Sequence, residues 1–350
     1  MIPQKVPIFG EEEASSCYKY IKSGGFLTEF KLTETFENMI CQYTGAKHCI
    51  CTTSGTAAIN MVFKCLNLKN KNVLVPNLTM IATPNAIKDA GYNPIFSDVD
   101  LTTHTINQPQ NTDVGAIVHV SLNGKAGNLD KIIKFCNENN IILVEDAAQS
   151  LGSFYNGKHL GTFGKVGIIS FSHPKIISTG QGGAVVTDDD ELAFNIRKFK
   201  DFGRISGGLD IHDSFGMNYK FTDLQASIGI EQMKKLPDRV EKMRQIFKWY
   251  VEEGLNIEQV NQIGWTPWFI EYKTNTRDEL FNYLKDNQVQ SRKFYPPICD
   301  QTIYNSNEIF ENSKSISYRT LWLPSSINLS KEDVKYIVNL INAFEKSRNT

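Results

Sequence analysis

Short apolar runs alternate with segments of helical periodicity along the first half of the chain, and this alternation limits the fold more than any other feature of the sequence. Three apolar runs occupy residues 73–76, 93–100 and 115–120, and residues 129–137 have the spacing of an amphipathic helix. A chain in which strands alternate with helices forms a largely parallel sheet that carries helices on both faces. We therefore expect an α/β protein.

The pattern changes in the last third of the chain. A charged helical stretch at residues 222–250 is interrupted near Pro237, because proline lacks the backbone N–H that a helix needs. Three further elements are predicted after it, a strand at 265–272 and helices at 277–287 and 331–346. We interpret them as a smaller α+β domain, and we expect a large cofactor-binding domain at residues 1–235 and a small one at 236–350.

Charge and composition argue against several classes of partner. The 350 residues include 37 basic and 38 acidic ones, so nothing in the totals favours a nucleic acid or an anionic membrane. No apolar run approaches the roughly 18 residues that span a bilayer, and residues 1–5 do not lead into the apolar core of a signal peptide. The seven cysteines lack the spacing of zinc ligands, so we expect reduced thiols, no metal and a cytoplasmic location.

One lysine stands out as a candidate reactive amine. Lys175 lies between an apolar run that ends at Ser170 and a glycine-rich turn at residues 180–183. Another apolar run leads into Asp146 and Gln149, at the carboxyl end of a predicted strand, where open α/β sheets bind ligands. A lysine beside a buried acid suggests a pyridoxal phosphate site, because this cofactor forms a Schiff base with a lysine and needs an acid to keep its pyridine nitrogen protonated.

Residues 54–56, with the sequence Ser-Gly-Thr, pass from a short β-like run into a helix. The start of a helix presents free N–H groups and a positive dipole end, so this segment is a candidate phosphate cradle. The same residues are also those of an ordinary helix N-cap. Taken alone, they leave both interpretations open.

Residues 145–188 resemble the DegT/DnrJ/EryC1/StrS family of sugar aminotransferases, within the fold-type I pyridoxal phosphate superfamily. Its members carry a Glu-Asp-Ala-Ala-Gln segment, a Gly-Thr-Phe-Gly turn, a Ser-Phe pair, the lysine and a Thr-Gly-Glu-Gly-Gly run, in this order. All recur here, with Gln181 in place of the glutamate. The resemblance extends from about residue 8 to residues 295–297. It implies a large domain in which a mostly parallel, seven-stranded sheet lies between helices.

The resemblance also implies a role for each residue of a cofactor site. Lys175 is the catalytic residue that forms the Schiff base, Asp146 pairs with the pyridine nitrogen, and Gln149 holds the phenolic oxygen. The phosphate contacts that it implies are those of Gly55, Thr56 and Ser170.

Two more cofactor contacts are implied. Met80 stands where most family members have an aromatic residue that stacks on the cofactor ring, so a thioether would take that role here; the alternative is an ordinary core residue. Asn218 corresponds to an asparagine that reaches the cofactor phosphate of the neighbouring subunit. The resemblance therefore implies a homodimer with shared active sites.

Relatives in this family mostly aminate a keto-sugar attached to a nucleoside diphosphate, with glutamate as the donor and pyridoxamine phosphate as the intermediate form of the cofactor. We expect a dTDP- or GDP-4-keto-6-deoxyhexose as acceptor and a viosamine-type or perosamine-type product. The alternatives are a nucleotide-sugar 3-aminotransferase, a 3-dehydratase or a non-catalytic regulatory relative. The dehydratases have histidine in place of the lysine, so Lys175 argues against that alternative, and His173 is not the corresponding position.

Three other polar or aromatic features remain open from the sequence. His119 lies in an apolar run and is either a core residue or one that faces the ligand. Arg204 either faces an anionic substrate or lies on the surface. The Tyr295-Pro296-Pro297 run either closes over the substrate or packs as a loop.

Overall fold

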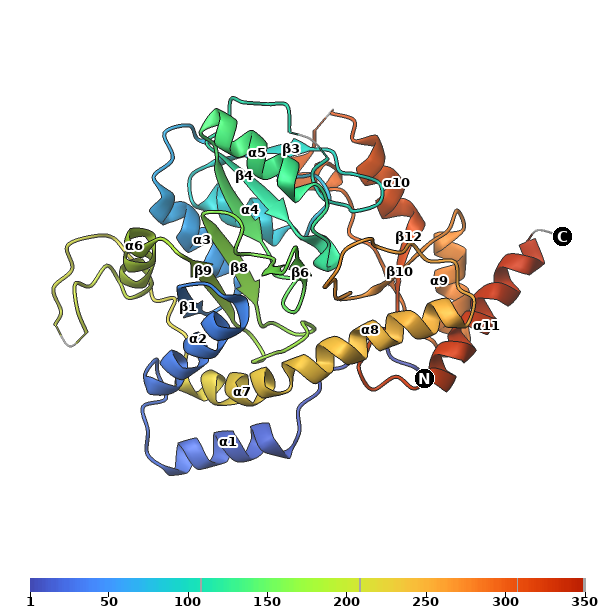
Figure 1. Ribbon diagram of the computed structural model, residues 1–350, viewed down its shortest axis with the longest axis horizontal. Helices are drawn as coiled ribbons and strands as arrows, with labels where there is room; N and C mark the ends of the chain where they lie inside the picture. Colours follow the sequence, from blue (N-terminus) through green and yellow to red (C-terminus); the bar gives the residue numbers. More distant parts are fainter. Residues whose placement is uncertain (108, 208, 307, 349–350) are drawn as a thin grey trace.

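The computed structural model describes residues 1–107, 109–207, 209–306 and 308–348. A central sheet lies between helices, and a smaller three-stranded sheet lies beside it (Figure 1). The strands of the central sheet are β1 (His48–Thr52), β2 (Asn72–Pro76), β3 (Asn93–Ser97), β4 (Ala116–Val120), β5 (Ile142–Asp146), β8 (Val166–Ser170) and β9 (Gly183–Thr187). Those of the small sheet are β10 (Ile270–Lys273), β11 (Arg292–Lys293) and β12 (Thr320–Leu323), and β6 (Phe154–Tyr155) forms a separate hairpin with β7 (Lys158–His159).

The central sheet has seven strands in the order β1-β9-β8-β5-β4-β2-β3. Strand β9 pairs antiparallel with both β1 and β8, and the remaining pairs are parallel. The prediction of a mostly parallel, seven-stranded sheet is therefore confirmed. Because parallel strands need crossover connections, helices cover both faces of the sheet.

Both faces of the sheet are buried, as the apolar strand sequences require. Side chains alternate between the two faces along a strand. In β1, Ile50 packs in the core that includes Val62 of helix α3 (Gly55–Leu66), whereas Cys51 packs on the opposite side in the core that includes Phe36 of helix α2 (Lys31–Thr44). In β5, Val144 packs on the α3 side, and its neighbour Leu143 packs in the core that includes helix α5 (Leu129–Asn139).

The α-helices end near the predicted boundaries where the sequence has clear caps or breaks. They are α1 (Glu11–Lys22), α2 (Lys31–Thr44), α3 (Gly55–Leu66), α4 (Ala82–Asp89), α5 (Leu129–Asn139), α6 (Asp190–Lys200), α7 (Asp223–Lys234), α8 (Leu236–Glu252), α9 (Arg277–Asp286), α10 (Glu311–Arg319) and α11 (Lys331–Arg348). Pro237 lies in the first turn of α8, where its missing N–H is tolerated, so the charged stretch forms two helices. In the described part of the chain, none of these helices is long and apolar enough to cross a bilayer.

One predicted element differs from the observed one. The strand expected at residues 265–272 is confined to β10, because the backbone before it bonds to side chains rather than to a neighbouring strand. Ser153 Oγ accepts a 3.0 Å hydrogen bond from the Thr266 N–H, and Asn123 Oδ1 accepts one of 2.8 Å from the Phe269 N–H.

Candidate active site

A cavity of about 320 Å³ opens where β4, β5 and β8 end and α3 begins. It is the position at which open α/β sheets bind ligands. All the residues predicted to contact a cofactor within one chain line this cavity, namely Gly55, Thr56, Met80, Asp146, Gln149, Ser170 and Lys175. Asn218 is not among the described residues that line it.

Lys175 follows β8, and its Nζ lies 4.0 Å from the centroid of the Trp268 ring. Burial lowers the pKa of this amine from 10.5 to about 8; the charge of Asp146 opposes the shift and that of Arg292 adds to it. A much larger share of the amine is therefore unprotonated near neutral pH than for an ordinary lysine. An unprotonated amine is the form that acts as a nucleophile or as a base.

Asp146 ends β5 with its side chain buried at the cavity wall. Its Oδ2 accepts a 2.7 Å hydrogen bond from the hydroxyl of Thr83, and its Oδ1 accepts one of 3.1 Å from the Ala148 N–H. These donors hold the carboxylate in one orientation. A fixed, buried carboxylate at this place can pair with a protonated ring nitrogen.

The amide of Gln149 is oriented by the backbone. Its Oε1 accepts a 2.9 Å hydrogen bond from the N–H of Asn123, so Nε2 is the donor side of the amide. Nε2 lies 3.5 Å from the hydroxyl of Tyr295, which comes from the far end of the chain. Gln149 therefore presents an N–H donor where it lines the cavity.

The start of α3 forms one end of the cavity. Ser54 is the N-cap, because its Oγ accepts a 3.0 Å hydrogen bond from the Ala57 N–H. Gly55 and Thr56 line the cavity, and the first N–H groups of a helix have no partner inside the helix. A Cβ on Gly55 would lie 3.1 Å from the Ser170 Cβ, so the helix start and the end of β8 are closely packed. The N-cap and the candidate anion cradle therefore occupy the same residues, and the two interpretations do not compete.

This set of groups fits pyridoxal phosphate. A lysine amine, a carboxylate, an amide donor and a helix start match an aldehyde, a ring nitrogen, a phenolic oxygen and a phosphate respectively. Within the described ranges, no group of three or more His, Cys, Asp and Glu side chains is placed to hold a metal ion. The residues present therefore support the cofactor that the sequence suggested.

Met80 lines the cavity and is 45% exposed, so the core alternative for this residue is wrong. Its Sδ accepts a 3.0 Å hydrogen bond from the Ala82 N–H at the start of α4. The hydrogen bond holds the thioether beside the cavity. Whether it stacks on a cofactor ring stays a prediction.

The remaining candidates lie away from the cavity. His119 is fully buried in β4, and burial lowers its pKa to about 4, so the core interpretation holds for it. Arg204 pairs with Asp210 at 3.3 Å in the loop between α6 and α7, and it does not line the cavity. Asn218 is exposed at the other end of this loop.

Four residues near the site were not recognised from the sequence, Lys5, Thr83, Asn123 and Trp268. Lys5 donates a 2.8 Å hydrogen bond to the Trp268 carbonyl oxygen, and it shares a small cavity with Lys175. Burial, followed by the charge of Lys175, lowers the pKa of Lys5 to about 7. No local sequence pattern marks these four residues, because their contacts join segments that lie far apart in the chain.

A model of the DegT/DnrJ/EryC1/StrS aminotransferase family, which depends on pyridoxal phosphate, matches residues 7–342. The chain is 30% identical to a GDP-perosamine synthase of Escherichia coli O157:H7, over 98% of each chain. It is 30% identical to a UDP-4-amino-4,6-dideoxy-N-acetyl-beta-L-altrosamine transaminase of Campylobacter jejuni, over 91% of this chain and 92% of the relative. The aminotransferase TlmJ from Streptoalloteichus hindustanus matches with a TM-score of 0.94 and 27% identity, over 99% of each chain, which confirms the fold-type I architecture. The chain is therefore a member of the DegT/DnrJ/EryC1/StrS aminotransferase family.

Proposed function

We propose that this aminotransferase moves an amino group from glutamate to a keto-sugar linked to a nucleoside diphosphate. The acceptor is a dTDP- or GDP-4-keto-6-deoxyhexose, and the product is a 4-amino-4,6-dideoxyhexose. The observation that carries the proposal is the meeting of Lys175, Asp146 and Gln149 at one cavity. The names of the relatives support the substrate class, because they include GDP-perosamine synthases and a transaminase of an amino-dideoxy sugar.

Each residue has a defined task in this proposal. Bound pyridoxal phosphate supplies an electron sink that stabilises negative charge on the carbon next to the amine. Lys175 would hold the cofactor covalently and, once free, would take the proton from the donor's α-carbon and deliver it to C4′, the aldehyde carbon of the cofactor. Asp146 keeps the ring nitrogen protonated by a charge-assisted hydrogen bond, and Gln149 donates to the phenolic oxygen. The start of α3 and Ser170 bind the phosphate.

The alternative reactions of the family receive less support. Lys175 lines the cavity, whereas the dehydratases have histidine at this position. His173 also lines the cavity but is exposed, so it is not a replacement for the lysine. A 3-aminotransferase would use the same groups, and only the product distinguishes it.

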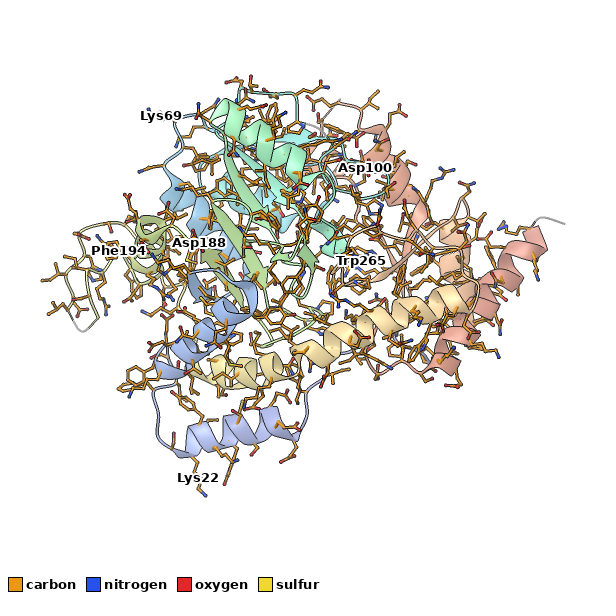
Figure 2. The ribbon with its side chains drawn as sticks, in the orientation of Figure 1. Lys22, Lys69, Asp100, Asp188, Phe194 and Trp265 are labelled. Atoms are coloured by element: carbon orange, nitrogen blue, oxygen red, sulfur yellow. The ribbon has the colours of Figure 1, made fainter. Side chains whose placement is uncertain are left out.

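We also propose a homodimer that shares its active sites, with a second copy of this chain as the partner. Large apolar side chains that are at least 40% exposed occur on two segments, Tyr18, Ile21, Phe26, Leu27 and Phe30 on the first, and Phe202, Ile205, Ile211, Phe215 and Met217 on the second. The second segment extends from the body of the molecule beside α6, where Phe194 is also exposed (Figures 1 and 2). Exposed apolar surface of this extent is typical of an interface. Asn218 belongs to the second segment, which supports a role in the partner's site.

Two further parts of the proposal concern location and domains. All seven cysteines are free thiols, which suits a cytoplasmic enzyme. The division at residues 235 and 236 falls between α7 and α8, and it remains our proposed boundary between a large and a small domain.

The decisive experiment incubates the purified protein, loaded with pyridoxal phosphate, with glutamate and a panel of nucleotide keto-sugars. We expect a dTDP- or GDP-linked 4-keto-6-deoxyhexose to give an amino sugar, with formation of 2-oxoglutarate, as resolved by mass and NMR. Lys175→Ala is the matched control and should give no product. An amine at carbon 3, or dehydration without amination, would overturn the assignment.

A further inference from the structure

Asn123 has an unusual place between β4 and the segment that precedes β10. It lies in the short 3-10 turn Leu122–Gly124, which follows β4, and it is buried with only 2% of its surface exposed. Its backbone is in the left-handed region, with φ 54° and ψ 30°. Asparagine tolerates this conformation better than most residues, so the position selects for asparagine or glycine.

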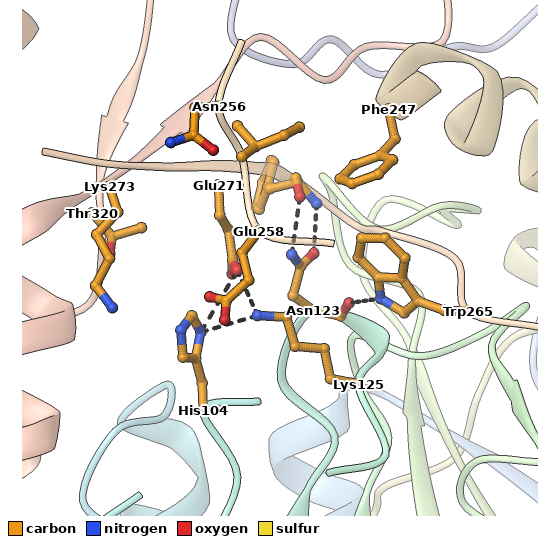
Figure 3. A pocket seen from close by; sticks show the side chains of 12 residues that line it. His104, Asn123, Lys125, Phe247, Asn256, Glu258, Trp265, Glu271, Lys273 and Thr320 are labelled. Carbon is orange, nitrogen blue, oxygen red and sulfur yellow. Dashed lines mark hydrogen bonds and ion pairs between the residues drawn. The ribbon is translucent and has the colours of Figure 1, made fainter. Parts of the chain in front are cut away.

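The side chain of Asn123 makes the hydrogen bonds to the backbone of residues 268 and 269 that a neighbouring strand would otherwise make. Its Oδ1 accepts hydrogen bonds from the N–H groups of Trp268 at 2.7 Å and Phe269 at 2.8 Å. Its Nδ2 donates one of 2.9 Å to the Phe269 carbonyl oxygen. Figure 3 shows this side chain facing the backbone of the opposite segment. One amide thus satisfies three buried backbone groups.

The backbone of Asn123 makes two further contacts. Its N–H donates to Gln149 Oε1 at 2.9 Å, and its carbonyl oxygen accepts from the indole N–H of Trp265 at 2.9 Å (Figure 3). Asn123 therefore connects Gln149, which lines the cofactor cavity, with Trp268, whose ring lies against the Lys175 amine. No other described residue makes hydrogen bonds to both Gln149 and Trp268.

The neighbours of Asn123 join the same two segments without reaching the active site. Lys125 forms a buried ion pair of 2.8 Å with Glu271, beside His104 and a small cavity of about 60 Å³ (Figure 3). Gln262 accepts a 2.8 Å hydrogen bond from the Ala126 N–H and donates one of 3.2 Å to the Gly124 carbonyl oxygen. These contacts attach the segment at residues 262–271 to the turn that follows β4. Asn123 is therefore not the only residue that joins the two segments.

We propose that Asn123 is a positioning residue of the active site, which holds the Trp268 indole against the Lys175 amine. The inference rests on the proposed function for the role of Lys175, but its geometry involves only residues of this chain. When Lys175 is not bonded to the cofactor, the indole face gives its amine a fixed contact by a cation–π interaction. Without that contact, the amine would have to be reoriented before each covalent step.

The test uses the cofactor-free protein and the rate at which an amine reagent labels Lys175, read by mass spectrometry of peptides. Asn123→Gly keeps the left-handed backbone and removes the amide. We expect about fivefold faster labelling, which corresponds to a loss of about 1 kcal/mol of restraint on Trp268, because its indole then keeps only the 3.0 Å hydrogen bond to the Pro174 carbonyl oxygen and covers the amine less closely. Asn140→Gly is the matched control, since Asn140 has φ 54° and ψ 38° but is exposed at the end of α5.

The second arm separates positioning from a general loosening of the structure. In a Trp268→Leu background, Asn123→Gly should add no further change in labelling, because the group through which it acts is gone. Gln262→Ala removes hydrogen bonds between the same two segments, those of Gln262 with Ala126 and Gly124. It should leave the labelling rate of Lys175 within about twofold of that of the original protein. The proposal would be overturned if Asn123→Gly raised the labelling rate of Lys175 by the same factor with and without Trp268→Leu. It would also be overturned if its effect were no larger than that of Asn140→Gly or Gln262→Ala.

A conservative variant covers the case in which Asn123→Gly does not fold. Asn123→Asp keeps the acceptor for the N–H groups of Trp268 and Phe269 but places a carboxylate oxygen in place of the donor to the Phe269 carbonyl oxygen, so we expect an increase that Trp268→Leu also abolishes. Borohydride fixation of pyridoxal phosphate, mapped in the unaltered protein, tests the proposed function separately. Fixation at another lysine would refute the proposed function, whereas additive labelling effects with fixation at Lys175 would refute only the role of Asn123.

Discussion

The hydroxyl of Thr83 donates a 2.7 Å hydrogen bond to Oδ2 of Asp146, and both side chains are buried where they line the cavity. Thr83 lies in the first turn of α4, whereas Asp146 ends β5, so the contact joins a helix start to the end of a strand. It fixes the plane of the carboxylate. A carboxylate that must pair with a ring nitrogen depends on such an orientation.

Thr83→Val removes this hydroxyl with little change in volume. Hydrogen bonds to charged groups contribute about 1.5–3 kcal/mol, so we expect kcat to fall by about tenfold or more. Affinity for pyridoxamine phosphate should also weaken. Thr83→Ser keeps a donor and should retain most of the activity. Equal losses in the serine and valine variants would contradict the role of the hydrogen bond.

The pH dependence of Lys175 is the second prediction. Its pKa of about 8 means that labelling of the amine in the cofactor-free protein should reach half its maximal rate near pH 8 and fall at lower pH, where the ammonium form dominates. Because the charge of Asp146 raises this pKa and that of Arg292 lowers it, Asp146→Asn should shift the midpoint down and Arg292→Gln should shift it up. Exposed Lys69 serves as the internal reference.

Two shifts in the same direction would contradict this electrostatic account. Asp146→Asn should also lose most of its turnover while keeping its melting temperature, because its main task is to hold the proton of the ring nitrogen. A loss of thermal stability with normal turnover would indicate a structural aspartate instead.

The third prediction concerns Lys5, whose pKa of about 7 is lowered first by burial and then by the charges of Lys175 and Arg239. Lys175→Met removes the like charge that has the larger effect on this pKa. The pKa of Lys5 should therefore rise above 7, and its labelling should require a higher pH. No carboxylate among the described residues forms an ion pair with Lys5, so no new partner compensates. An unchanged labelling midpoint at Lys5 would show that the two amines are not coupled.

The sequence predicted the residues of the site that lie in short local motifs, and it did not predict contacts between residues that are far apart in the chain. Lys175, Asp146 and Gln149 lie within short motifs at strand ends, so their residue types and order were sufficient. Thr83 lies 63 positions from Asp146 and Asn123 lies 146 positions from Phe269. No local pattern marks such contacts, because they arise only when β4, β5 and the approach to β10 meet.

The fold, too, was predicted correctly in one part and wrongly in another. The alternation of strands and helices predicted the sheet, because parallel strands that are buried on both faces are continuously apolar. The strand expected at residues 265–272 was wrong for its first half, where the aromatic sequence is typical of a strand but the pairing partners are side chains. A sequence pattern indicates which residues are buried, but it does not indicate which groups form hydrogen bonds with their backbone.

The fourth prediction concerns Met80, which is exposed at the cavity rather than buried in the core. Met80→Tyr should leave the melting temperature unchanged and should keep or tighten cofactor binding, since stacking partners differ by about 0.5–1.5 kcal/mol. Met80→Leu keeps the size but removes the sulfur and its contact with the Ala82 N–H. Titration of the cofactor-free protein with pyridoxamine phosphate gives the affinities. Weaker binding by the tyrosine variant, at unchanged stability, would argue against a stacking position.

The last prediction tests the shared site. Lys175→Ala and Asn218→Ala chains should each be strongly impaired, and mixing them should restore activity. If Asn218 serves the partner's site, each mixed dimer has one site with both lesions and one with neither. After random reassembly of equal amounts, about half the dimers are mixed, so about a quarter of all sites are intact.

The opposite arrangement gives a different result with the same proteins. If Asn218 served the cavity of its own chain, every site in a mixed dimer would carry one lesion, and mixing would give only the average of the parents. Exchange of chains must be verified by mass spectrometry of the intact dimers, because slow exchange would imitate that result. Lys69→Ala chains mixed with Lys175→Ala chains provide the control, since they should lose activity only in proportion to the inactive sites. A gain above the parental average therefore requires that Asn218 acts across the subunit boundary.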